Sequence, residues 1–154
     1  MPYLKIWIHC VWATKNRVPV LTPEIRQKLF AHIRENAAAK QIHLDLINGY
    51  VDHVHCLISL NQEQTISKII QLIKGESSCW INKTKLCRRR FEWQDGYFAL
   101  SVSESAVNHL REYIKNQEEH HNKKSFAHEH TEFLVRHGFS QSNGQSRHTF
   151  NLIT

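Results

Sequence analysis

Two histidines near the middle of the chain stand one residue apart and could bind a metal ion. His53 and His55 alternate with Val54 in GYVDHVHCLISL, a segment with the β-branched and apolar composition of a strand. Because successive strand side chains point to opposite faces, both imidazoles would lie on the same face. Asp52 adds a carboxylate that is one residue out of phase. The competing interpretation is that two of twelve histidines fall at this spacing by chance or pair across a sheet surface.

A tyrosine and a glutamine four residues apart form the second candidate pair. Tyr113 and Gln117 occur in HLREYIKNQEEHH, where residues at this spacing share one face of a helix. One side chain could bind a metal ion while the other attacks a substrate. Alternatively, Tyr113 is an amphipathic side chain at the edge of the core and Gln117 is a solvated polar residue. Each pair is weak evidence for a site when taken alone, but together the two pairs supply a metal site and a nucleophile.

The charge of the chain indicates an anionic partner. Its formal net charge is +6 and its isoelectric point is near 9.3. A nucleic-acid backbone fits this balance, although a solvated basic face gives the same totals. The basic residues that could contact phosphates are Lys15, Arg17, Lys74, Lys83, Arg88, Arg89 and Arg90. We expect each of them to contribute general electrostatic attraction rather than to read bases.

Length and composition favour one cytoplasmic domain. The 154 residues can build one hydrophobic core, and a hydrophobic fraction of 41% is ordinary for a globular protein. No stretch approaches the roughly 18 apolar residues of a membrane span, and the first residues do not form a cleavable signal. The four cysteines have no C-x-x-C spacing, which argues against a zinc knuckle and against a disulfide framework.

Strand and helix patterns alternate along the chain and must position these residues. Strand patterns cover 3–13, 42–51, 54–60 and 97–102, and helix patterns cover 23–39, a segment that begins at Thr65, the segment with Tyr113, and about 126–137. Thr22 and Thr65 are expected N-caps, and Ser101 and Glu104 have the spacing of a capping box. The order predicts an α+β, ferredoxin-like β-α-β-β-α-β fold, with an antiparallel sheet, helices on one face and an added C-terminal catalytic helix.

Taken together, these segments resemble the HUH single-tyrosine transposases, which comprise small bacterial insertion-sequence transposases and REP-associated tyrosine transposases. The resemblance runs from HCVWATKNRVPVLTPEI through GYVDHVHCLISL and ISKIIQLIKGESSCWINK to WQDGYFALSVSESAVNHLREYIKNQEEHH and the HGF near residue 139, or about nine-tenths of the chain. It implies that His53, His55 and Gln117 hold Mg²⁺ or Mn²⁺ and that Tyr113 is the nucleophile. It also implies a single domain over residues 1–138. The ending at 139–154 departs from the family pattern and is expected to be a flexible tail.

The resemblance implies cleavage and rejoining of single-stranded DNA at hairpin-bearing element ends through a 5′-phosphotyrosine intermediate. A divalent cation would polarise the phosphate and stabilise the charge on the leaving 3′ oxygen. The sequence does not decide which base removes the Tyr113 proton; the candidates are water, a metal-bound hydroxide, Glu118, His120 and His121. That His120 and His121 support the metal ligands from behind is the less favoured interpretation, and surface positions are expected for both. The family implies a homodimer, whose active site could form within one subunit or between two.

Two other functions are compatible with the same residues. One is a nucleic-acid-binding or regulatory module on the same fold, in which the histidines are incidental. The other is a metal-dependent nuclease in which water attacks and Tyr113 only positions the substrate. A covalent protein–DNA adduct would separate the transposase from both.

Overall fold

The computed structural model of the chain describes residues 2–117. The helix predicted at about 126–137 and the tail predicted at 139–154 lie outside the described residues, as do Glu118, His120 and His121. Within residues 2–117, no helix combines the length and apolar character needed to cross a bilayer.

Four strands form one antiparallel sheet in the order β2-β3-β1-β4. In chain order the elements are β1 (Ile6–Ala13), the short 3-10 turn η1 (Lys15–Arg17), α1 (Pro23–Ala39), β2 (His43–Gly49), β3 (His53–Leu60), α2 (Ile66–Thr84), β4 (Phe98–Val102), the short 3-10 turn η2 (Glu104–Ala106) and α3 (Val107–Lys115). The order of strands and helices confirms the α+β, ferredoxin-like prediction.

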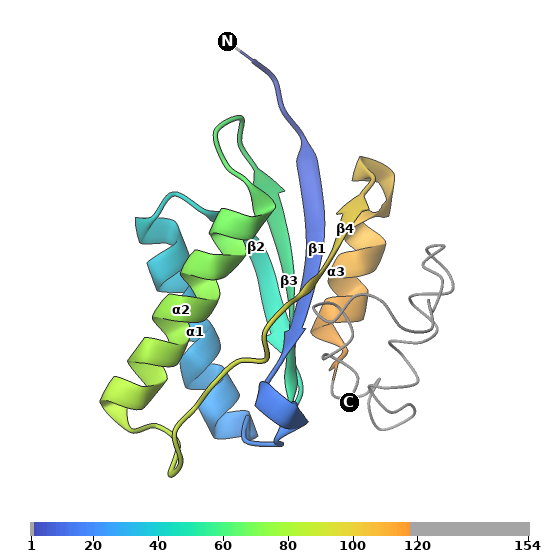
Figure 1. Cartoon of the computed structure of the whole chain (residues 1–154). Coiled ribbons are helices and arrows are strands. Elements are labelled where there is room, and N and C mark those ends of the chain that lie inside the picture. The colour runs from blue at the N-terminus through green and yellow to red at the C-terminus, as the bar shows by residue number, and fades with distance from the viewer. Residues whose placement is uncertain (1, 118–154) are drawn as a thin grey trace, which may run out of the picture.

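The helices cover both faces of the sheet, as Figure 1 shows: α1 and α2 lie against one face, and α3 lies against the other. The larger core fills the first interface, where Ile8, Cys10 and Trp12 of β1 are buried. A smaller apolar cluster of Leu57, Val107 and Ile114 lies beneath α3. The alternation predicted for the first strand therefore separates an apolar face from a face that carries the candidate site.

The helix starts agree with the sequence in two of three places. The side chains of Thr22 and Thr65 each accept a hydrogen bond from a backbone N–H in the first turn of α1 and α2, as predicted for N-caps. The capping box predicted at Ser101 is wrong, because Ser101 lies within β4. Glu104 accepts a hydrogen bond of 2.6 Å from the indole N–H of Trp7 instead, which ties η2 to β1.

A tight connection between β2 and β3 sets the position of the first candidate histidine. The backbone N–H of Tyr50 donates to the carbonyl of His53 over 3.0 Å. A Cβ atom at Gly49 would collide with the backbone oxygen of His53, so the chain needs a glycine there. His53 therefore begins β3 directly after a turn that has no room for a side chain at position 49.

Candidate metal centre and tyrosine

The two candidate histidines lie side by side on the α3 face of β3. His53 is 0% exposed and His55 is 3% exposed, and their ring centroids are 5.1 Å apart at an interplanar angle of 74°. Their partners on β1 are Ala13 and Val11, whose short side chains leave room for both imidazoles. The shared face expected from strand alternation is thus present, and both rings are shielded from bulk water.

Asp52 fixes the ring of His53 from one side. Its Oδ1 atom lies 2.8 Å from Nδ1 of His53, and its Oδ2 atom lies 3.5 Å from Nε of Arg17. Donation from Nδ1–H to a carboxylate places the lone pair of the imidazole on Nε2, the arrangement typical of metal-ligating histidines. Arg17, predicted as a DNA contact, therefore faces the carboxylate that orients His53.

The turn that carries Arg17 has an unusual backbone. Asn16 and Arg17 have φ angles of 56° and 54°, in the left-handed region that residues other than glycine rarely adopt. The side-chain oxygen of Gln94 accepts a hydrogen bond of 3.0 Å from the backbone N–H of Asn16, and the Thr14 hydroxyl donates to the carbonyl of Val18 over 2.9 Å. These contacts hold a strained conformation that brings Arg17 to Asp52.

A third histidine, which the sequence did not single out, contacts the pair. His9 of β1 is 1% exposed, and its Nε2 atom lies 2.9 Å from Nδ1 of His55. The two rings stack, with centroids 5.2 Å apart and planes at 20°. Strand alternation places His9 on the opposite face from Ile8 and Cys10, which the sequence could have indicated. Which side chains of the next strand it contacts depends on the strand pairing, which the sequence does not show.

Tyr113 reaches the site from α3, and Gln117 follows two residues after the helix ends at Lys115. The half-buried tyrosine ring lies 5.8 Å from the ring of His55, at 77°. Gln117 is 0% exposed and its Nε2 donates to the Tyr113 carbonyl over 3.2 Å, so the interpretation of this side chain as solvated is wrong. The bond to its amide nitrogen leaves the amide oxygen as the atom of Gln117 suited to a metal.

Two side chains of β2 attach α3 to the sheet. The amide of Asn48 donates to the carbonyls of Ile114 and Lys115 over 2.9 and 3.1 Å. The guanidinium of Arg111 pairs in bidentate geometry with Asp45, over 2.8 and 3.0 Å. Asn48 also lies opposite His55 in the β2–β3 register, so one residue links the end of the tyrosine helix to the imidazole strand.

The donor atoms available to a metal differ from those of a structural zinc site. In the described part of the chain, no group of three or more His, Cys, Asp and Glu side chains is arranged to hold a metal ion. The four cysteines are free thiols, and Cys10 and Cys56 are buried in the core on the other face of the sheet. The candidate set is therefore two imidazoles and one amide oxygen, which leaves coordination positions for water and phosphate oxygens.

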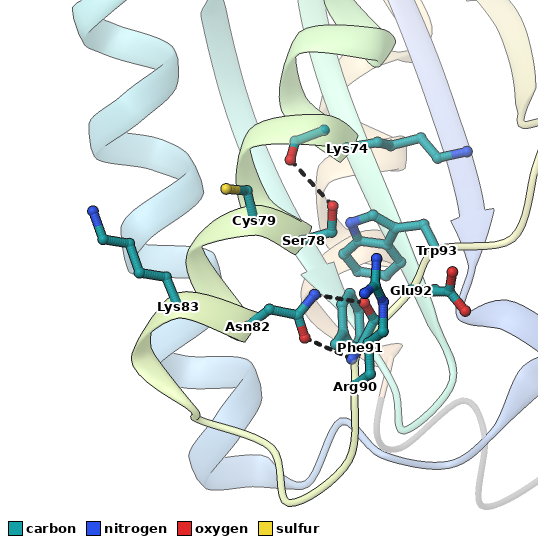
Figure 2. A pocket seen from close by; sticks show the side chains of 10 residues that line it. Lys74, Ser78, Cys79, Asn82, Lys83, Arg90, Phe91, Glu92 and Trp93 are labelled. Carbon is teal, nitrogen blue, oxygen red and sulfur yellow. Dashed lines mark hydrogen bonds between the residues drawn. The ribbon is translucent and has the colours of Figure 1, made fainter.

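Six of the seven predicted DNA-contacting residues gather around two adjoining hollows. One hollow lies between the η1 turn and the segment 86–92 and is lined by Lys15, Arg88, Arg89 and Arg90. The other lies between α2 and the segment 90–93 and is lined by Lys74, Lys83 and Arg90, as Figure 2 shows. The hollows share Arg90, Phe91 and Glu92. Residues far apart in sequence thus form one basic surface.

Two members of this surface are already engaged within the protein. The ammonium of Lys74 donates to the carbonyls of Gln94 and Gly96 over 2.7 and 2.8 Å, and burial lowers its pKa to about 8. Lys15 pairs with Glu92 over 3.1 Å. Asn82 holds the wall of the second hollow through two hydrogen bonds with the backbone of Phe91 (Figure 2). Within this surface, Lys83 and the three consecutive arginines are the cations best placed to meet a phosphate.

Comparison with known proteins identifies the family. The family described as Transposase IS200 like matches residues 3–117. The chain is 28% identical to the ISDra2 transposase TnpA of Deinococcus radiodurans over 114 residues, covering 71% of this chain and 81% of the relative. It is 26% identical to the transposase for insertion sequence element IS200 of Salmonella typhimurium over 115 residues, covering 71% and 74%.

Solved structures agree with this assignment. A crystal structure from Deinococcus radiodurans, described as a transposase, superposes with a TM-score of 0.62 at 26% identity and covers 75% of this chain and 93% of the other. A REP-associated tyrosine transposase bound to a REP hairpin shares the fold, with a TM-score of 0.53 at 19% identity, covering 91% and 73%. The chain therefore belongs to the IS200-like family of HUH single-tyrosine transposases.

Proposed function

We propose that this transposase cleaves and rejoins single-stranded DNA at hairpin-bearing element ends, with Tyr113 as nucleophile and with Mg²⁺ or Mn²⁺ held by His53, His55 and Gln117. The observation that carries the proposal is the position of Tyr113 beside His55, 5.8 Å between ring centroids, above two imidazoles shielded from water. Buried polar groups cost free energy, so their concentration beside a half-buried tyrosine is characteristic of a functional site.

The proposed ligands fit a hard divalent cation that keeps open positions. Asp52 orients His53 through Nδ1, and Gln117 is held to the Tyr113 carbonyl through its amide nitrogen. The atoms left for a ligand are then an imidazole nitrogen and an amide oxygen, both uncharged. When bound, such a cation supplies positive charge beside the scissile phosphate.

Tyr113 performs the covalent step in this proposal. Its phenol oxygen bonds to phosphorus and the bond from phosphorus to the 3′ oxygen breaks, which leaves a 5′-phosphotyrosine and a free 3′ hydroxyl. The phenol proton must leave during attack, because an ordinary tyrosine pKa is about 10. Attack by a different 3′ hydroxyl on the phosphotyrosine reverses the step and joins new ends without an external energy source.

The basic surface is the proposed DNA interface. One of its hollows includes residues of the turn after β1, and the other adjoins it through Arg90, Phe91 and Glu92. That turn lies at the end of the sheet where β3 begins and α3 ends (Figure 1). A backbone bound along Arg88, Arg89 and Arg90 would therefore approach the site from the same end of the molecule. Phosphate contacts of this kind supply affinity that falls with salt. The solved relative bound to a REP hairpin supports a hairpin as ligand.

The proposal includes a homodimer in solution. A dimer would allow Tyr113 to act with histidines of its own chain or of a partner. Multi-angle light scattering on the full chain measures the mass, and mixing a Tyr113→Phe chain with a His55→Ala chain tests how the site is built. Restored cleavage in that mixture means a site shared between subunits, whereas no restoration means a site within one chain.

A labelled-DNA assay tests the proposed chemistry. Single-stranded DNA spanning the flanks of the gene is incubated with the protein and Mn²⁺, and the products are separated on a denaturing gel. We expect a protein-linked strand that requires Mn²⁺ and is lost in Tyr113→Phe. Cleavage that survives Tyr113→Phe would favour the water-using nuclease, and DNA that is bound but never cleaved would favour the binding module.

A further inference from the structure

We propose that His9 is a positioning residue that holds His55 in the tautomer with its proton on Nδ1, so that Nε2 is presented as the metal-binding nitrogen. The inference rests on the proposed function, because it takes His55 as a metal ligand. The family resemblance assigned no role to this third histidine.

The register of the sheet brings the two rings together. His9 lies opposite Leu57, and Val11 lies opposite His55, so His9 and His55 are diagonal neighbours on the α3 face of adjacent strands. Diagonal neighbours are within reach of ring side chains. The observed contact is a 2.9 Å approach between Nε2 of His9 and Nδ1 of His55, with nearly parallel rings.

Only one proton arrangement of this contact leaves His55 able to bind a metal through Nε2. If His9 donated, Nδ1 of His55 would use its lone pair as acceptor, and the neutral ring would carry its proton on Nε2. If His55 donates from Nδ1–H to the lone pair of His9, the lone pair of His55 is on Nε2. Metal-ligating histidines usually donate their other ring N–H to such an outer partner.

The two candidate ligands would then each be oriented by a different group. Asp52 receives the Nδ1–H of His53, and His9 receives the Nδ1–H of His55. Burial of His9 and His55, at 1% and 3% exposure, limits competition from water for the hydrogen bond. The stacked ring of His9 also restricts rotation of the His55 ring, so both the tautomer and the orientation depend on one neighbour.

Three variants of the full-length protein separate positioning from packing. His9→Phe keeps an aromatic ring but removes the acceptor, and His9→Gln places an amide oxygen near the position of Nε2. His32→Phe is the matched control, because His32 also combines a hydrogen bond, 2.8 Å to Glu76, with a ring stack, 4.0 Å to Trp80. His32 belongs to α1 and Glu76 to α2, on the other face of the sheet.

Two readouts other than activity decide the matter. Mn²⁺ binding to DNA-free protein, followed by electron paramagnetic resonance, should weaken about 10–100-fold in His9→Phe. His9→Gln should stay within a few-fold of wild type, and His32→Phe should bind like wild type. In metal-free protein, ¹⁵N chemical shifts of His55, assigned with His55→Ala, should show the proton on Nδ1 in wild type and in His9→Gln but a mixture of tautomers in His9→Phe.

Equal Mn²⁺ affinity in wild type and His9→Phe would overturn the inference, as would a wild-type His55 with its proton on Nε2. If His9→Phe fails to fold, His9→Leu replaces it and must give the same loss. If wild type binds Mn²⁺ no better than the His53→Ala, His55→Ala double variant, the metal site of the proposed function fails. The metal-free tautomer measurement then still decides whether His9 controls the ring.

Discussion

The two faces of the sheet bury side chains of opposite character. Toward α1 and α2 the strands present apolar side chains: Ile8, Cys10 and Trp12 from β1, and Val54, Cys56 and Ile58 from β3. On the α3 face, His9, His53, His55 and Gln117 are buried to nearly the same degree. Apolar burial stabilises a fold, whereas polar burial costs free energy unless hydrogen bonds offset it. The comparison assigns stability mainly to the first face and chemistry to the second.

The sulfur and nitrogen groups on these two faces illustrate the difference. Burial raises the pKa of Cys10 to about 12 and also raises the pKa of Cys56 well above its ordinary value, so neither thiol is a nucleophile near neutral pH. The imidazoles on the opposite face are as deeply buried, but hydrogen bonds join His53 to Asp52 and His55 to His9. Connection to an oriented polar partner, rather than burial itself, distinguishes the candidate site.

The largest expected effects come from one variant on each face of the sheet, and these two variants should impair different properties. His55→Ala should reduce formation of the DNA adduct by at least about 100-fold, because even outer partners of metal ligands are worth 10–100-fold. Hairpin binding should change far less, since phosphate contacts supply affinity. Trp12→Ala should instead cost about 3–5 kcal/mol of unfolding free energy in urea, from the cavity it leaves. Equal loss of binding and cleavage in His55→Ala would contradict this division.

The Asp52 carboxylate gives the next largest expected effect. Asp52→Ala removes the acceptor for Nδ1–H of His53 and should weaken Mn²⁺ binding about 10–100-fold by titration calorimetry. Arg17→Ala should act in the same direction but less, because Arg17 acts on His53 indirectly, through the Asp52 carboxylate 3.5 Å away. Unchanged Mn²⁺ affinity in Asp52→Ala would mean that His53 needs no outer partner.

Asn48 tests whether attachment of α3 matters to the reaction. Asn48→Ala removes two hydrogen bonds to the end of the helix and should cost about 1 kcal/mol of stability. Asn82→Ala is the control, because Asn82 also makes two hydrogen bonds with backbone, at Phe91. We expect similar unfolding free energies for both variants. At saturating DNA, where a change of DNA affinity at the hollow that Asn82 lines no longer affects the rate, only Asn48→Ala should form the adduct more slowly. Equal cleavage rates would show that the β2 contact does not position Tyr113.

The basic surface should give the smallest effect on chemistry. Arg89→Ala should weaken DNA binding and reduce the slope of log affinity against log salt by about one if Arg89 contacts a phosphate. Cleavage at saturating DNA should stay within about two-fold, because the arginine supplies affinity rather than chemistry. Lys74→Met should lower stability instead, since its ammonium holds two backbone carbonyls. An unchanged salt slope would remove Arg89 from the interface.

Local patterns predicted the elements and the shared face of His53 and His55 because both follow from periodicity and capping. The contact between His9 and His55 depends on the β1–β3 register, which no local pattern contains. The contact of Arg17 with Asp52 depends on the left-handed backbone of Asn16 and Arg17, which the sequence did not predict. From its charge alone, Arg17 was predicted to contact DNA. Ser101 had capping spacing but lies in β4, where pairing with β1 takes precedence.

Mass spectrometry of the covalent adduct tests the central claim most directly. The protein is incubated with single-stranded DNA from the ends of its element and Mn²⁺, then digested with protease and nuclease, and the nucleotide-bearing peptide is sequenced. We expect a 5′-linked nucleotide on Tyr113 and on no other residue, with no adduct when Mn²⁺ is chelated. A nucleotide on Tyr97 or Tyr50, or cleaved DNA without any linked peptide, would contradict the assignment of Tyr113 as the nucleophile.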